Sequence, residues 1–177
     1  KTLHTEAALN KVRQLAKILS KIQPKLKLYL IPFYEIQKEI IANIPAEYRM
    51  IIYRRFMHKI AAKIAEKENA KAIITGDNIA QVASQTLENL NCIYKATSIL
   101  TLSPLLGMNK EEIIEIAKMI GTYEISILPY ADCCSFMIAE HPKTKAKLAE
   151  IEALEKLIAE EERLVEKAVE KAAIESF

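Results

Sequence analysis

Two neighbouring thiols, Cys133 and Cys134, are the most reactive groups that this sequence places side by side. A vicinal pair can supply an attacking or a resolving thiol if one thiol is exposed and its pKa is lowered, although Asp132 beside them opposes that lowering. Adjacent cysteines do not readily share one metal ion, and no CxxC spacing or histidine cluster indicates zinc, so we expect no metal site. The pair therefore predicts either sulfur chemistry or two buried structural thiols, whereas Cys92 is expected in the core.

Gly76 and a pair of arginines could bind an anion such as a phosphate. Gly76 follows the apolar run at residues 72–75, and a glycine between a strand and a helix lets backbone N–H groups approach a ligand. The alternative is a tight connection that needs a positive φ. Arg54 and Arg55 lie within a predicted helix, where one guanidinium could reach a phosphate or both could belong to a solvated basic face.

Lys110 stands in the first turn of another predicted helix, where the helix macrodipole disfavours a cation. An anionic ligand could hold the lysine there. Equally, Lys110 could be a surface residue whose charge is offset by Glu111 and Glu112. The residues themselves leave both interpretations open.

The elements that must position these residues follow from the spacing of apolar side chains and from the glycines and prolines that interrupt it. Asp77 or Asn78 can cap one helix, Asn109 with Glu112 forms a capping-box pattern for another, and Gly121 suits the position just after that helix. We predict helices over residues 5–22, 34–42, 45–67, 79–89 and 110–120, and strands over residues 26–31, 72–75 and 99–102.

Strands that alternate with helices of this length indicate an α/β fold, in which helices flank a parallel sheet. Ligands of such folds bind outside the carboxyl ends of the strands, which places residues 75–77 and 103–105 on the functional rim. Residues 143–177 are rich in Ala, Glu, Lys and Leu and predict a helical C-terminal extension to a domain over residues 1–142. Three strands make a small sheet, so we expect further elements before residue 1.

The bulk composition excludes some classes of protein. Half of the 177 residues are apolar (51%) and 27% are charged, as in ordinary globular domains. A net charge of +2 is too weak to indicate a nucleic-acid partner by itself, and the basic segment at residues 141–147 could contact a nucleic-acid backbone or be a solvated helix start. No apolar run approaches the roughly 20 residues of a membrane span, so we expect no membrane partner. Three cysteines do not make a disulfide framework, which favours the reducing cytoplasm.

Many short motifs, taken together, resemble the tRNA 4-thiouridine synthetases, also called tRNA uracil 4-sulfurtransferases and linked to thiamine biosynthesis. The resemblance covers roughly residues 5–150 and is specific, because the motifs recur in the family's order and at its separations. They are Pro32-Phe33, Glu35-Ile-Gln-Lys38, Glu47-Tyr-Arg-Met50, Arg54-Arg55, Thr75-Gly76, Gln81-Val-Ala-Ser-Gln-Thr-Leu-Glu88, Pro104-Leu105, Lys110-Glu-Glu-Ile-Ile114, Gly121-Thr-Tyr-Glu-Ile-Ser126 and Asp132-Cys-Cys134.

The resemblance implies a PP-loop pyrophosphatase domain that uses ATP with Mg²⁺ to adenylate a uracil carbonyl in tRNA, after which a persulfide delivers sulfur and AMP leaves. By resemblance, Arg54, Gly76 and Gln85 would contact the nucleotide, and Lys110 would be the lysine needed for activation. Cys133 would pair with the thiol that carries the sulfur. The implied partners are tRNA, a cysteine desulfurase or another persulfide donor, and a second copy of the chain in a homodimer.

This sequence also departs from the family pattern. The Ser-Gly-Gly-x-Asp-Ser turn of the PP-loop is absent, so we do not expect this polypeptide alone to adenylate a substrate. Residues 77–80 read Asp-Asn-Ile-Ala where members usually read Glu-Ser-Leu-Gly, and Ser103 replaces a usual arginine. Two other interpretations remain: a non-catalytic module that binds a nucleotide or tRNA or acts as a scaffold, and a redox or metal dithiol protein that uses Cys133 and Cys134.

Overall fold

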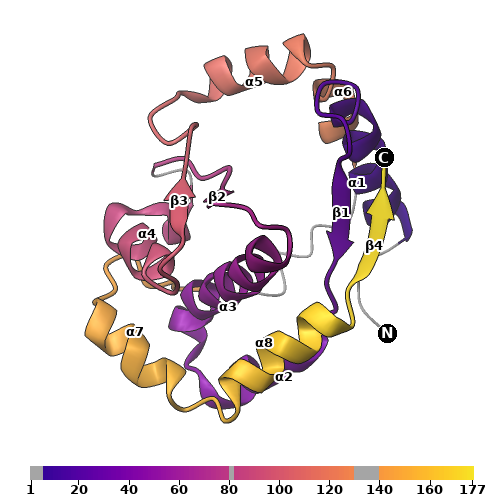
Figure 1. Cartoon of the computed structure of the whole chain (residues 1–177). Helices are drawn as coiled ribbons and strands as arrows, with labels where there is room; N and C mark the ends of the chain where they lie inside the picture. Colours follow the sequence, from indigo (N-terminus) through magenta and orange to yellow (C-terminus); the bar gives the residue numbers. More distant parts are fainter. Residues whose placement is uncertain (1–5, 80–81, 130–139) are drawn as a thin grey trace. The chain divides into compact units, whose positions relative to one another are not determined.

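The computed structural model describes residues 6–79, 82–129 and 140–177, which fall into two units (Figure 1). Unit 1 contains α1 (Glu6–Leu19), β1 (Lys27–Leu30), α5 (Lys110–Met119), α6 (Tyr123–Ser126) and β4 (Ala173–Ser176). Unit 2 contains α2 (Tyr34–Asn43), α3 (Ala46–Lys67), β2 (Ala72–Ile74), the 3₁₀ turn η1 (Ala83–Gln85), α4 (Leu87–Tyr94), β3 (Leu100–Leu102), α7 (Leu148–Glu155) and α8 (Glu161–Glu170).

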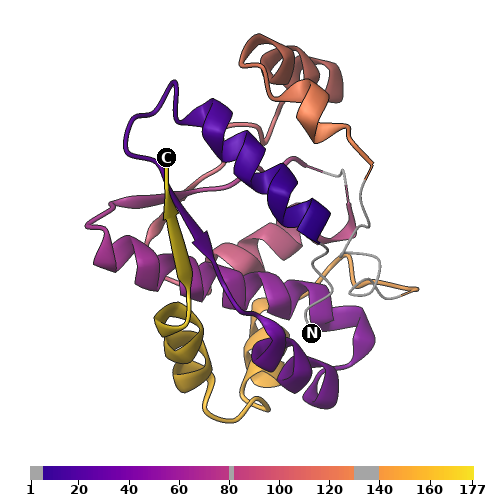
Figure 2. The same cartoon turned by 90° about the vertical axis from the view of Figure 1, so that its right-hand side faces the viewer.

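Unit 1 is organised around a two-stranded antiparallel sheet, in which Lys27 of β1 lies opposite Ser176 of β4. Figure 2 shows the two strands side by side. Arg13 on α1 binds Glu175 on β4, with 2.8 Å between Nη2 and Oε1. This ion pair joins α1 to β4, so two described segments that are far apart in the sequence are held together within one unit.

Helix α5 of unit 1 begins and ends as the sequence predicts, whereas α6 was not predicted. Asn109 and Glu112 form the expected capping box, in which each side chain accepts a hydrogen bond from the other residue's backbone N–H. Gly121 follows α5 with a φ of 75°, a conformation that costs glycine little. These local predictions are confirmed.

Unit 2 is built around the 22-residue helix α3, which packs against α2, α4, α7 and α8. Apolar side chains four residues apart, Tyr48, Ile52, Phe56 and Ile60, are all buried and form one face of the core. Pro45 directly precedes the helix, where the N–H that proline lacks would have had no partner inside the helix. The strands β2 and β3 pair in parallel, with Ala72 opposite Leu100, as the predicted α/β fold requires.

Three sequence predictions need correction. The strand at residues 26–31 is present as β1, but it pairs with β4 instead of joining β2 and β3 in a parallel sheet. Residues 148–155 and 161–170 form the predicted C-terminal helices, yet residues 173–176 form a strand, because pairing with β1 overrides their helical propensity. The helix predicted over residues 79–89 is replaced by η1 and by α4, which starts at Leu87.

Candidate nucleotide site at the ends of β2 and β3

The turns that follow β2 and β3 are joined by hydrogen bonds, so the two strand ends form one continuous rim. The Thr75 N–H donates to the Leu102 carbonyl at 2.9 Å, and the hydroxyls of Thr75 and Ser103 lie 2.9 Å apart. Asn78 Nδ2 donates to the Leu105 carbonyl at 2.8 Å. Residues 75–77 and 103–105 thus lie together at the carboxyl ends of the strands, as predicted.

The carboxylate of Asp77, which is only 4% exposed, is the centre of this rim. Arg54 Nη2 lies 2.6 Å from both carboxylate oxygens, and Gln85 Nε2 donates to Oδ1 at 3.2 Å. The Tyr94 hydroxyl donates to Oδ2 at 2.8 Å and lies 2.7 Å from the Ser103 hydroxyl. Helix α3, the turn η1 and helix α4 therefore all contribute a side chain to one acidic group.

Asp77 is therefore a hydrogen-bond acceptor and ion-pair partner, and the predicted role of Asp77 or Asn78 as a helix cap is wrong. Both side chains are used on the rim, and the cap of α4 is Thr86, whose hydroxyl accepts from the Asn89 N–H. Burial alone would raise the pKa of Asp77, but the hydrogen bond from Tyr94 and the charge of Arg54 outweigh it and lower that pKa. Asp77 is thus an anion at neutral pH, and it holds Arg54 and Gln85 in fixed directions.

Arg54 keeps hydrogen-bonding capacity for a further group. Its Nη2 binds Asp77 and its Nη1 approaches the Ser84 carbonyl at 3.4 Å, but within the described residues Nε–H and one N–H of Nη1 have no acceptor. The side chain is 16% exposed, so a ligand can reach it. A guanidinium fixed in this way is suited to a planar anionic group or a phosphate.

Gly76 lies between Thr75 and Asp77 and is open on the side where a Cβ would project, since no atom lies within 4 Å of that position. Its φ is not positive, so the alternative explanation of a strained tight turn is wrong. This open space lets a ligand that binds the fixed guanidinium of Arg54 also approach the backbone at Gly76 closely.

His58 lies one helical turn beyond Arg54 and is 6% exposed. Its ring stacks at a tilt on Tyr94, with 5.4 Å between centroids, and its Nδ1 is buried without a hydrogen-bond partner in the described structure. Burial and the neighbouring Arg54 lower the pKa of His58, so the ring is neutral at pH 7. His58 and Tyr94 had no motif to reveal them in the sequence.

Arg55 leaves α3 in a different direction from Arg54 and binds Glu155 on α7 through Nη2 at 2.7 Å. Both side chains are buried, Lys59 lies 2.8 Å from the same carboxylate, and Arg55 also donates to the Cys92 carbonyl. Helix α3 therefore has no solvated basic face at these positions. Cys92 is buried, as predicted.

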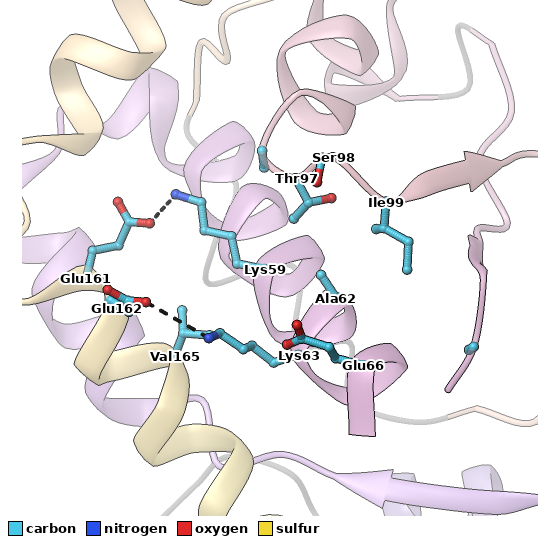
Figure 3. Close-up of a pocket in the computed structure, with 12 residues that line it drawn as sticks. Lys59, Ala62, Lys63, Glu66, Thr97, Ser98, Ile99, Glu161, Glu162 and Val165 are labelled. Atoms are coloured by element: carbon cyan, nitrogen blue, oxygen red, sulfur yellow. Dashed lines mark hydrogen bonds and ion pairs between the residues drawn. The ribbon is translucent and has the colours of Figure 1, made fainter. Parts of the chain in front are cut away.

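A separate pocket of about 670 Å³ lies near the amino-terminal ends of β2 and β3. Figure 3 shows the side chains of α3 and α8 that line it, with Lys59 turned towards Glu161 and Lys63 towards Glu162. Since these lysines are paired with glutamates, the pocket offers no unpaired cation from α3. Its position at the other ends of the strands separates it from the Asp77 cluster.

The comparisons with known proteins agree on one family. The family model described as "Thiamine biosynthesis protein (ThiI)" matches residues 1–159. The chain belongs to this family. The resemblance recognised in the sequence is thereby confirmed.

Relatives of this ThiI-family chain carry matching names. It is 45% identical over 171 residues to a probable tRNA sulfurtransferase of Halothermothrix orenii, covering 96% of this chain and 43% of the relative. It is 46% identical over 142 residues to a probable tRNA sulfurtransferase of Thermus thermophilus, covering 80% of this chain and 35% of the relative. The chain thus spans less than half the length of these relatives.

A solved structure confirms the predicted fold class. The crystal structure of a 4-thiouridine synthetase–RNA complex with bound ATP matches with a TM-score of 0.93 and 41% identity, covering 98% of this chain and 45% of that one. No described helix of the ThiI-family chain is long and apolar enough to span a membrane. The described residues also contain no group of three or more His, Cys, Asp or Glu that could hold a metal ion.

Of the residues predicted for the site, the structure brings together Arg54, Gly76 and Gln85 around Asp77. Lys110 is the exposed first residue of α5 in unit 1, and its side chain has no ion pair within the described structure. Cys133 and Cys134 lie outside the described residues. The roles of Lys110 and Cys133 therefore rest on the resemblance alone.

Proposed function

We propose that this chain is part of an ATP-dependent tRNA sulfurtransferase that forms 4-thiouridine in the cytoplasm. The observation that carries the proposal is the convergence of Arg54 and Gln85 on Asp77, beside the open backbone of Gly76. This cluster stands at the carboxyl ends of parallel strands, where α/β folds bind their ligands.

In this proposal ATP, as its Mg²⁺ complex, is a substrate. Attack of the uracil carbonyl oxygen on the α-phosphorus releases pyrophosphate and leaves an adenylated base. Arg54 and Gln85 contact the nucleotide with the donors that Asp77 leaves available, and the backbone at Gly76 lets it approach closely. Lys110 neutralises phosphate charge during this step, which gives a reason for a cation at a helix start.

Sulfur then reaches the activated carbon from a persulfide supplied by a cysteine desulfurase or another donor, and AMP leaves with the former carbonyl oxygen. Cys133 either attacks the persulfide to release sulfide or resolves it, and in both cases it ends in a disulfide with the carrier thiol. A reductant must restore that disulfide before the next turnover. We propose a homodimer as the assembly, by analogy with the family.

Equilibrium binding of ATP and of AMP to this chain, measured by titration calorimetry, tests the nucleotide site. We expect Arg54→Ala to weaken binding roughly 10- to 100-fold, since a hydrogen bond to a charged group contributes about 1.5–3 kcal/mol. Arg49→Ala is the matched control, because Arg49 lies on the same helix and donates to the backbone of Ile44 and Ile41 instead. We expect this control to bind like the unmodified chain.

Circular dichroism of each variant separates loss of binding from loss of folding. Equal weakening in the Arg49 and Arg54 variants would remove the assignment of Arg54. Absence of ATP and AMP binding by the folded, unmodified chain would favour a non-catalytic scaffold.

A further inference from the structure

The positive charge of this chain is concentrated in its first elements. Six of the 25 Lys and Arg residues lie between Glu6 and Glu35, and none of the 23 Asp and Glu residues does. The rest of the chain, with 19 cations, is net acidic. The net charge of +2 is therefore the sum of a basic segment and an acidic remainder. The six lysines and arginines of the basic segment lie in α1, in β1 and in the turn between them.

Lys11 and Arg13, both on α1, have partners inside unit 1. Lys11 Nζ donates to the carbonyls of Ser126 at 2.6 Å and Leu128 at 3.0 Å, which ties α1 to the end of α6. Arg13 binds Glu175. These contacts fix α1 in place and explain why the sequence has cations at residues 11 and 13.

Three other cations, Lys17, Lys21 and Lys25, have no such explanation. All three are exposed, and within the described residues none of their ammonium groups has a hydrogen bond or an ion pair, since the one side-chain contact of Lys17 is made by its backbone carbonyl, which accepts from the Ser20 hydroxyl. The turn that bears them is ordered by backbone hydrogen bonds: the Ser20 N–H donates to Ala16 O and the Gln23 N–H to Leu19 O, both at 2.8 Å. We call these three lysines and their turn the α1–β1 basic turn.

Stabilisation of the fold explains few of the lysines in the α1–β1 basic turn. A cation in the last turn of a helix is favoured by the macrodipole, which covers Lys17 but falls off before Lys25. By contrast, Lys143 in the basic segment at residues 141–147 lies over the ring of Tyr48, and a hydrogen bond with Tyr48, followed by the charge of Glu150, raises the pKa of Lys143. Lys143 is therefore less available to an outside anion than the three lysines of the turn.

We propose that the α1–β1 basic turn binds the phosphate backbone of the tRNA substrate, an inference that rests on the proposed function. Three ammonium groups on an ordered turn, with no carboxylate between them in sequence, can each neutralise a phosphate and release its counterions. The choice of RNA follows from the solved 4-thiouridine synthetase–RNA complex, whose match covers 98% of this chain and so includes most of α1 and β1.

The test is fluorescence anisotropy of labelled unmodified tRNA titrated with this chain at several salt concentrations. We expect Lys17→Gln/Lys21→Gln/Lys25→Gln to weaken binding about tenfold or more at low salt. We also expect it to reduce the slope of log K against log salt by roughly 2–3, at about 0.7–0.9 per lost phosphate contact. The matched control, Lys156→Gln/Lys167→Gln/Lys171→Gln, removes the same charge from exposed positions in the acidic segment that carries α7 and α8.

Equal loss in both triple variants would overturn the proposal, since only net charge would then matter. A second outcome would overturn the proposal in favour of a membrane surface. In that outcome the unmodified chain binds vesicles with anionic lipid, and Lys17→Gln/Lys21→Gln/Lys25→Gln loses vesicle binding but keeps tRNA binding. Nucleotide binding should be the same in both variants. The two proposals therefore fail in different measurements. If the basic turn does not bind tRNA, nucleotide binding is unaffected; if the ATP site is wrong, even the unmodified chain binds no nucleotide.

Discussion

Arg54 and Arg55 are neighbours in sequence, and each binds one carboxylate, but the two ion pairs have different surroundings. Successive residues of a helix point about 100° apart, so the two guanidinium groups leave α3 in different directions. Arg55 and Glu155 are both almost fully buried, and Lys59 completes the pair. Arg54 is partly exposed, and it shares Asp77 with Gln85 and Tyr94 beside the open space at Gly76.

The surroundings of each ion pair therefore indicate whether it serves the core or a ligand. A buried pair whose partners satisfy each other can join helices but has no capacity for a ligand, and its net contribution to stability can be small. An ion pair at the edge of the core, in which some N–H donors have no acceptor, can be held rigidly and still bind a ligand. The same residue type in adjacent positions therefore serves structure in one case and a candidate site in the other.

The largest expected effect is on the buried pair. Arg55→Met leaves the Glu155 carboxylate buried with one cation fewer, which should lower the free energy of unfolding by about 3–5 kcal/mol. Arg55→Met/Glu155→Leu should recover much of this loss, because a well-packed apolar pair replaces two charges and Lys59 retains Glu161. Urea denaturation measures both.

The control for this prediction is Arg163→Met, which removes an exposed ion pair with Glu160 and should cost at most about 1 kcal/mol. If Arg55→Met costs no more than this control, the two ion pairs of α3 do not differ in the way the structure indicates.

A smaller stability effect, but a larger effect on ligand binding, is expected at Asp77. Asp77→Asn keeps the shape of the side chain but turns an amide N–H₂ or a neutral oxygen towards Arg54 and Gln85. We expect a loss of about 1–3 kcal/mol in unfolding free energy, since Arg54 can reach water, together with weaker ATP binding. Calorimetry on the same samples measures both quantities.

Glu160→Gln, at an exposed carboxylate that binds Arg163, is the matched control and should change neither quantity appreciably. Unchanged ATP affinity in a folded Asp77→Asn chain would show that Asp77 does not position Arg54 and Gln85 for a nucleotide.

The smallest expected effect is a pH dependence from His58, whose ring faces Arg54, Arg55, Asp77 and Tyr94. Its folded-state pKa lies below the unfolded value of 6.5, so below that pH the unfolded chain takes up a proton that the folded chain does not. Stability should therefore fall as pH drops from 7.5 to 5.5, by up to about 1.4 kcal/mol per pH unit below 6.5.

Urea denaturation at several pH values measures this slope. We expect His58→Gln to remove most of it and His141→Gln, at an exposed position, to retain it. The carboxylates of Asp77 and Glu155 do not contribute in this range, because both have lowered pKa values and their contribution is lost only below their unfolded values of 3.8 and 4.5. A slope that survives in His58→Gln would mean that another group titrates.

The amino-acid sequence was enough to predict most local elements and the family. Apolar spacing indicated α1 and α3, the capping box and Gly121 indicated the ends of α5, and the order of short motifs indicated the family. The helix signals are readable because they depend on neighbours within a few residues, and the family signal is readable because the motifs keep their order along the chain. The fold class followed from the alternation of strands and helices.

Contacts between residues far apart in the sequence became visible only once the chain was folded. Asp77 looks like a helix cap in sequence, and it becomes the partner of Arg54, 23 positions away, because α3 packs beside the end of β2. The strand at Ala173–Ser176 exists because β1 offers it hydrogen bonds, although its composition favours a helix. Arg54 and Arg55 are equivalent in sequence, and only the packing of α3 gives one a site and the other a place in the core.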